Sequence, residues 1–192
     1  TILSDVCTPP CWENIVPGRS TVSDVREAEN RLPLIDTERT AWVYKQNQYD
    51  TIFSWNFLDS DVKGGWIYFK NGVVELIYLS GGFNVALETV VEKYGSPEFV
   101  IVGNSFTPGL FTYGYQNQVH LIYEEAGMII SLKPNVNADI KASTKIDRVM
   151  FFDPTEIEAI TQEWVSAGLL GELKRWNWQG YGRFTLEGEK RR

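Results

Sequence analysis

The chain has 192 residues, a formal net charge of -7 at pH 7 and a sequence pI near 4.8. Its acidic charge argues against a nucleic-acid partner, because affinity for phosphate backbones depends on clustered Lys and Arg. No apolar run reaches the roughly 18 residues that a membrane-spanning helix needs, so we expect no transmembrane segment.

Both cysteines lie in the segment Cys7-Thr-Pro-Pro-Cys11. They cannot complete a four-ligand zinc site without His120 and a carboxylate, so we expect no structural metal. We favour a disulfide over two buried free thiols, which implies an oxidising compartment. A fully extended segment would separate the two Cα atoms by about 12 Å, beyond the roughly 7 Å that a disulfide tolerates. We therefore predict a proline turn, bent by a cis bond before Pro9 or Pro10 or by a turn centred on Pro10 and Cys11.

The first predicted helix spans residues 20–32, where apolar residues recur at helical spacing. Ser20 or Thr21 is a good N-cap for it. Two segments rich in strand-forming residues follow at 41–44 and 51–58, and we expect one or two strands there.

Residues 66–78 predict a β-hairpin. Asn71-Gly72 is the preferred pair for a two-residue type I′ turn. In that hairpin we expect Ile67 opposite Leu76, with one face in the core and the other partly solvated.

The same order of elements then recurs. A helix is predicted at 84–94, strands at 99–102 and 110–115, and a second hairpin at 119–132 that turns around 125–127. A helix followed by antiparallel strands, present twice, indicates a tandem repeat.

The C-terminal part begins with a predicted strand at 145–152. Asp153 as N-cap, Pro154 at the first helical position and Glu156 two residues later predict a helix start. The segment 173–182 is rich in aromatic residues and has no clear period.

These patterns predict an α+β fold of two tandem units, each a helix plus an antiparallel sheet. We expect the helices on one face of the sheet or sheets, and a C-terminal strand, helix and aromatic tail packed on the body. The predicted units are residues 1–80, 83–152 and 153–192, with the alternative that all three form one domain.

No residue pattern predicts catalysis. His120 is the only histidine and lies in a predicted strand, so we expect a residue on a sheet face. Glu124 and Glu125 are adjacent in a predicted hairpin tip and point in different directions. We expect no catalytic residue, no metal and no cofactor, with a carboxylate-dependent hydrolase as the alternative.

Trp176, Trp178 and Tyr181 form a possible binding surface. On an extended segment the two indoles share one side, where they suit stacking on a sugar ring or anchoring a protein. The alternative, which we favour, is that this segment closes the core with its indoles buried.

Two motifs carry a family resemblance. They are Pro10-Cys-Trp-Glu-Asn-Ile-Val-Pro-Gly-Arg-Ser-Thr21 and the segment Leu87 to Pro97, which ends in Tyr-Gly-Ser-Pro. The chain resembles uncharacterised bacterial extracytoplasmic lipoproteins, and more distantly the SmpA/OmlA lipoproteins and the β-lactamase inhibitory protein. This resemblance implies a protein, secreted or lipid-anchored upstream of Thr1, that binds other proteins without catalysis.

We therefore expect a non-enzymatic, extracytoplasmic binding or scaffolding protein that acts through a protein partner. The alternative is a carbohydrate-binding module that takes a glycan on its surface tryptophans.

Overall fold

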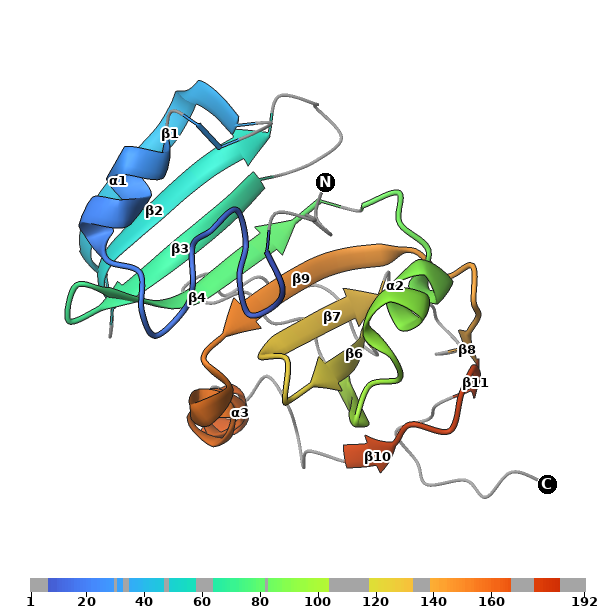
Figure 1. The fold of residues 1–192 in the computed structure, drawn as a ribbon. Coiled ribbons are helices and arrows are strands. Elements are labelled where there is room, and N and C mark those ends of the chain that lie inside the picture. Colours follow the sequence, from blue (N-terminus) through green and yellow to red (C-terminus); the bar gives the residue numbers. More distant parts are fainter. Residues whose placement is uncertain are drawn as a thin grey trace.

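The structure is a computed structural model that describes residues 7–29, 31–32, 35–46, 49–57, 64–81, 83–103, 118–132, 139–166 and 175–183. Its helices are α1 (Val22–Glu29), α2 (Leu87–Tyr94) and α3 (Ile157–Ser166), and a 3₁₀ turn, η1 (Pro154–Glu156), precedes α3 (Figure 1). Its strands are β1 (Ile35–Gln46), β2 (Tyr49–Phe57), β3 (Gly64–Lys70), β4 (Val73–Ser80), β5 (Phe99–Gly103), β6 (Gln118–Tyr123), β7 (Met128–Leu132), β8 (Asp139–Ile140), β9 (Ile146–Phe152), β10 (Arg175–Asn177) and β11 (Gly182–Arg183).

Helix α1 begins where the sequence predicts an N-cap. Oγ1 of Thr21 accepts a hydrogen bond from the Asp24 amide at 3.3 Å, and Oδ2 of Asp24 accepts one from the Thr21 amide at 2.7 Å. This reciprocal pair is a capping box, which satisfies amides that have no partner within the helix. The Thr21 backbone and hydroxyl bonds lower the pKa of Asp24, because they stabilise its carboxylate.

The hairpin of β3 and β4 turns at the predicted pair, with φ of 53° at Asn71 and 75° at Gly72. The register shifts between Tyr68 and Phe69, and Ile67 therefore lies opposite Ile77. The predicted pairing of Ile67 with Leu76 is wrong by one residue, because an irregularity within the ladder leaves no mark on the alternation of apolar residues.

Nine of the described strands form one antiparallel sheet in the order β1-β2-β3-β4-β9-β7-β6-β5-β10 (Figure 1). The other two, β8 and β11, pair with each other. Strand β9 joins the two sides of the large sheet, since it pairs with β4 on one side and with β7 on the other. Strands from the predicted units 1–80 and 83–152 thus belong to one sheet.

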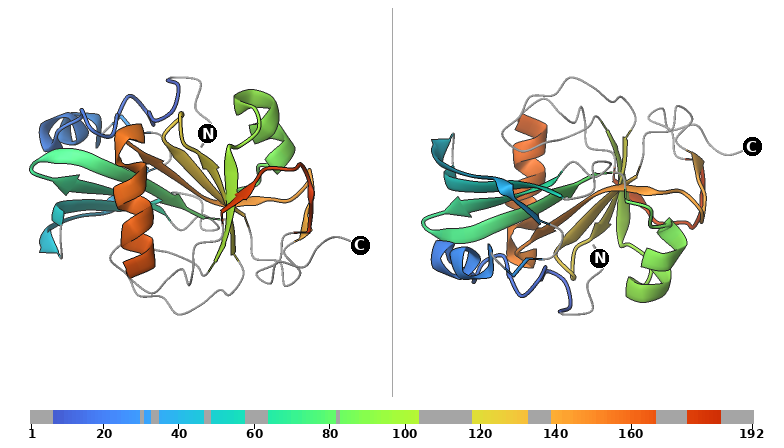
Figure 2. Two further views of the ribbon diagram at one scale, coloured as in Figure 1. Left: turned by 90° about the horizontal axis from the view of Figure 1, so that it is seen from below. Right: turned by 90° about the horizontal axis from the view of Figure 1, so that it is seen from above.

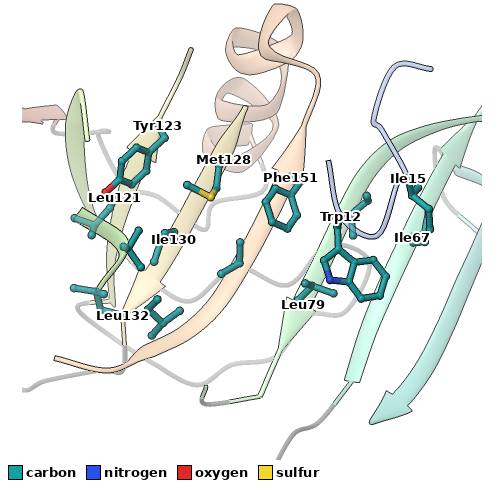
Figure 3. Close-up of a cluster of buried hydrophobic side chains, with 14 of the residues drawn as sticks. Trp12, Ile15, Ile67, Leu79, Leu121, Tyr123, Met128, Ile130, Leu132 and Phe151 are labelled. Atoms are coloured by element: carbon teal, nitrogen blue, oxygen red, sulfur yellow. The ribbon is translucent and has the colours of Figure 1, made fainter. Parts of the chain in front are cut away.

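Both faces of the sheet are covered. Helices α1 and α2 lie on the same side (Figure 2) and bury Val25, Leu87 and Val90 in one core cluster. Trp12 and Ile15 of the N-terminal segment complete this core, which Figure 3 shows in part. Helix α3 contributes Ile157 and Ile160 to a second cluster, built on the opposite side chains of the strands.

The predicted α+β class, with helices packed on one face, is wrong. About half of the described residues lie in strands and about a fifth in helices, and the three helices have only 8, 8 and 10 residues. The protein is a β-rich antiparallel sheet with few helices. The expected solvated face is absent from the central strands, because consecutive residues such as Ile77 and Tyr78 are 0% and 1% exposed.

The second hairpin turns at Gly127, whose φ is 57° and whose amide donates to the Glu124 carbonyl oxygen at 3.0 Å. A Cβ at this position would approach the Phe152 carbonyl oxygen to 2.3 Å, so glycine is required there. The predicted strand at 110–115 lies outside the described residues.

Candidate functional site

Strand β1 forms one end of the sheet. Among the described strands, only β2 pairs with it, in a register that shifts between Asp36 and Thr40 and is regular afterwards. We call the side of residues 41–46 that is turned away from β2 the outer edge of β1. A regular edge of this kind presents backbone donors and acceptors that suit an added strand.

Two large apolar side chains are exposed at this edge. Val43 is 42% exposed and Tyr44 is 60% exposed, whereas the side chains opposite them on β2 are buried. Because consecutive residues of a strand point to opposite faces, Val43 and Tyr44 expose apolar surface on both faces of the same edge.

Trp42 anchors the edge to the core. Its ring centroid lies 4.6 Å from that of Phe53 and 5.8 Å from that of Phe69, and its Nε1 donates to Glu29 Oε2 at 3.3 Å. Because these contacts involve β2, β3 and α1, the Trp42 ring is fixed from three sides. Trp42 therefore packs this part of β1 onto the core.

Arg26 of α1 links the two aromatic residues. Its guanidinium carbon lies 4.3 Å from the Trp42 ring centroid, and its Nη2 donates to the Tyr44 hydroxyl at 2.6 Å. Arg26 therefore orients the Tyr44 side chain, although Tyr44 is 60% exposed. Rigid aromatic side chains with little conformational freedom to lose are suited to serve as anchors in protein interfaces.

The sequence predicted a strand at 41–44 but no functional role for Val43, Tyr44 or Arg26. Edge position depends on the order of strands in the sheet, which chain order does not determine. A local signal was nevertheless present, because charged residues such as Asp36, Glu38 and Arg39 within a strand are typical of an edge.

The predicted aromatic surface lies at the other end of the sheet. Trp176 belongs to β10, which pairs with β5, and Trp176 and Trp178 are both half-buried against the core. Tyr181 is 41% exposed, and its ring meets that of Trp178 edge-on at 5.8 Å. Both indoles pack against the core, but they are half-buried and not fully buried as the core-closing alternative expects, and Tyr181 alone among the three is well exposed.

Tyr123 lies beneath this aromatic segment. It is 2% exposed, and its hydroxyl donates to the Gly95 carbonyl oxygen at 3.2 Å. Burial raises the pKa of Tyr123, and the charges of Glu98 and Tyr181 nearby add to the rise. The raised pKa favours the protonated phenol, which is the form that donates to Gly95.

The predicted disulfide between Cys7 and Cys11 is present, with a Cα separation of 5.8 Å. The chain bends through a cis bond between Pro9 and Pro10, one of the predicted alternatives. Sγ of Cys7 accepts a hydrogen bond from the Asn14 amide at 3.4 Å. The bridge thus holds the segment that inserts Trp12 into the core.

Buried polar side chains form a row across four neighbouring strands. Ser80, Arg148, Ser131 and His120 are successive register partners on β4, β9, β7 and β6, and all are less than 9% exposed. Nδ1 of His120 lies 2.8 Å from Ser131 Oγ, and Arg148 Nε lies 3.1 Å from Asp147 Oδ2. His120 lies on a sheet face as predicted, but the sequence did not predict that its neighbours are polar.

A hollow of about 340 Å³ lies between α1 and the turn formed by Trp12–Ile15. Two of the carboxylates in its wall are already engaged within the chain, since Glu27 pairs with Arg31 at 3.3 Å and Asp24 accepts from Thr21. Within the described ranges, no three His, Cys, Asp or Glu side chains lie close enough to hold a metal ion. In the same ranges, every helix is too short or too polar to cross a membrane.

Comparisons with known proteins identify no family. No family model matches the chain, and no curated protein matches it. The crystal structure of a cysteine-rich secretory protein from Staphylococcus aureus subsp. aureus Mu50 matches with 11% identity and a TM-score of 0.34. The match covers 90% of this chain and 58% of that one.

Proposed function

We propose that this chain is a non-enzymatic binding or scaffolding protein that works outside the cytoplasm through protein–protein contacts. The observation that carries the proposal is the outer edge of β1, where Val43 and Tyr44 expose apolar surface on a strand whose pairing with β2 is regular. Edges with this character are used to bind proteins by strand addition.

The Cys7–Cys11 disulfide supports the location, because such bonds persist in oxidising compartments. Secretion or a lipid anchor upstream of Thr1, a tandem duplication and a relationship to envelope lipoproteins remain predictions. The absence of catalysis is likewise a prediction, to which the 2% exposure of the only histidine lends support.

The glycan alternative has less support. Sugar-binding sites offer exposed aromatic faces, whereas Trp176 and Trp178 pack against the core. Titration with bacterial cell-wall glycans should leave tryptophan fluorescence unchanged. A saturable shift that is abolished in Tyr181→Ala would favour the glycan reading instead.

Site-directed photo-crosslinking in the cell that produces the protein tests the proposed function. A photoreactive phenylalanine analogue at Tyr44 should give a discrete protein adduct, and the same analogue at Thr89, an exposed position on α2, should not. Val43→Lys should abolish the adduct from position 44. Equal labelling from positions 44 and 89, or no adduct from either, would contradict the proposal.

A further inference from the structure

The turn between β3 and β4 is anchored at both ends. At one end, the Asn71 amide donates a hydrogen bond to the Asp50 carboxylate. At the other, the Gly72 carbonyl oxygen accepts a hydrogen bond from the Val22 amide at 3.2 Å. The first bond belongs to the peptide before Asn71 and the second to the peptide after Gly72. The central peptide, between Asn71 and Gly72, can therefore rotate without breaking either anchor.

Rotation of the central peptide brings Asn71 to the backbone geometry of a cyclic imide. With φ of 53° at Asn71 and 75° at Gly72, the turn is of type I′. Flipping the central peptide gives type II′, which keeps φ positive at Asn71 and moves its ψ to about -120°. A five-membered ring that joins the Asn71 side chain to the next backbone nitrogen requires ψ in the same region. Gly72 tolerates either sign of φ, so the flanking strands need not move.

The surroundings of the turn leave room for such a ring. Asn71 is exposed, and a Cβ on Gly72 would meet no heavy atom within 4 Å. Asn14 provides a contrast, because it is also exposed and has φ of 66° but precedes a β-branched residue. That residue, Ile15, is 2% exposed, and its amide donates to the Trp12 carbonyl oxygen at 2.8 Å. The backbone nitrogen after Asn14 is therefore shielded, whereas the one after Asn71 is open.

We propose that Asn71 deamidates spontaneously in the folded protein and that the product loosens the start of α1. The Gly72 nitrogen attacks Cγ of Asn71, and the new N–Cγ bond replaces the Cγ–Nδ2 bond. Nδ2 leaves as ammonia and takes the proton of the Gly72 amide. Water then opens the imide at either carbonyl, which gives aspartate, or isoaspartate with the backbone running through the side chain. Water is the only co-reactant, and the reaction is independent of any partner at the β1 edge.

The turn holds the first residues of α1, so a change in the turn affects the helix. Thr21 forms a β-bridge with Val73, and the Val22 amide depends on the Gly72 carbonyl oxygen. Isoaspartate adds one carbon to the backbone of the turn and displaces this carbonyl oxygen. Either product also adds a negative charge to the residue whose amide Asp50 holds, and like charges at short range are unfavourable.

Peptide mapping by mass spectrometry of the chain, aged at neutral and at mildly alkaline pH, tests the site. The peptide with Asn71 should gain the mass of an amide converted to an acid, faster at the higher pH because the attacking nitrogen must lose its proton. Asn14 in the same sample should remain an amide. An isoaspartyl methyltransferase should label the aged chain but not aged Asn71→Gly, which suits a type I′ turn and has no amide to lose.

The guanidinium-unfolded chain gives the reference rate. Type II′ is itself a favoured hairpin turn, so the flip should cost little. Conversion in the folded chain should be at most about tenfold slower than in the unfolded chain, which corresponds to a cost of about 1.4 kcal/mol.

Hydrogen exchange tests the effect on α1. In the modified chain, separated by anion exchange, the Val22 amide should exchange faster than in the fresh chain. The Leu87 amide, which begins α2 and donates to the Thr144 carbonyl oxygen at 2.9 Å, should exchange at an unchanged rate. Aged Asn71→Gly should match its fresh form at both positions.

Three results would overturn the inference. The first is conversion of Asn71 only in the unfolded chain, because it would show that the folded turn protects this residue. The second is equal conversion of Asn14 and Asn71. The third is a Val22 amide whose exchange is unchanged in the modified chain, since the start of α1 would then be unaffected by the product.

Discussion

The two ends of the sheet are built differently. Strand β1 has 12 residues and carries the exposed side chains of Val43 and Tyr44. Strand β10 has three residues, and its Trp176 is half-buried against the core. At the β10 end, the guanidinium carbon of Arg175 lies 4.8 Å from the Phe99 ring centroid and covers the neighbouring strand.

Proteins commonly protect an edge by keeping its strand short and charged, and β10 follows that rule. Strand β1 follows it only in its first part, where the register is irregular and Glu38 and Arg39 are exposed. From Ala41 to Tyr44 the edge is regular and its residues are apolar or aromatic. Our proposal assigns partner binding to the exposed β1 end, whereas the short β10 strand follows the usual pattern of a protected edge.

The largest expected effect concerns the junction between the two ends. Phe152 of β9 is 0% exposed, and β9 joins the two sides of the sheet through β4 and β7. Phe152→Ala should lower the free energy of unfolding by about 3–5 kcal/mol, because it leaves a cavity in a packed core. Scanning calorimetry should show one transition shifted as a whole. Two transitions, with only one shifted, would mean that the two ends unfold independently.

Removing the disulfide should destabilise the folded protein, and the effect should be confined to the N-terminal segment near the bridge. Replacing Cys7 and Cys11 by Ser should cost about 2 kcal/mol, because the bridge closes only a short loop. Hydrogen exchange should accelerate in residues 11–16 and remain unchanged in β10. Equal acceleration at both ends would contradict a local role for the bridge.

At the β10 end, the indole of Trp176 should stabilise the folded protein through its buried apolar area and not through a hydrogen bond of its N–H. Its Nε1 is buried without a hydrogen-bond partner among the described residues. Trp176→Ala should cost about 1–2 kcal/mol for the half-buried side chain. Trp176→Phe should cost less, because it removes a buried N–H that gains no bond. Urea unfolding of both variants checks this, and equal losses would contradict it.

Alkaline pH should give a graded effect, which is absent at neutral pH and grows with each pH unit above 10. Burial raises the pKa of Tyr68, on β3, and of Tyr123, beneath the β10 segment, from the ordinary value of 10.0. Above pH 10 the unfolded chain releases these protons and the folded chain retains them. The free energy of unfolding should therefore fall by up to about 1.4 kcal/mol per pH unit for each tyrosine. Tyr68→Phe and Tyr123→Phe should each flatten this slope, and an unchanged slope would show that the phenol ionises in the folded protein.

Local features of the fold were predictable from the sequence. Asn71-Gly72 predicts its turn because few residue pairs tolerate positive φ at both positions, and the proline spacing predicts the bend between Cys7 and Cys11. Helix starts at Thr21 and Asp153 follow from their hydrogen-bonding side chains. Each of these signals involves residues within a few positions of one another.

The fold class and the β1 edge were not predictable in the same way, because both depend on long-range pairing. No residue pattern within β9 indicates that this strand pairs with β4. The position of β9 in the sheet nevertheless determines which strands lie at the two edges. Apolar residues at 41–44 indicate a strand, but their exposure follows from the absence of a described strand beyond β1. The packing of Trp176 and Trp178 against the core was anticipated only as one of two alternatives.

The most direct test of the contrast between the two ends is photo-crosslinking from each of them in the cell that produces the protein. A photoreactive phenylalanine analogue at Tyr44, on the outer edge of β1, should give a discrete protein adduct, whereas the same analogue at Asn177, an exposed position on β10, should give none. Adducts in equal yield from both positions, or no adduct from position 44, would contradict the account.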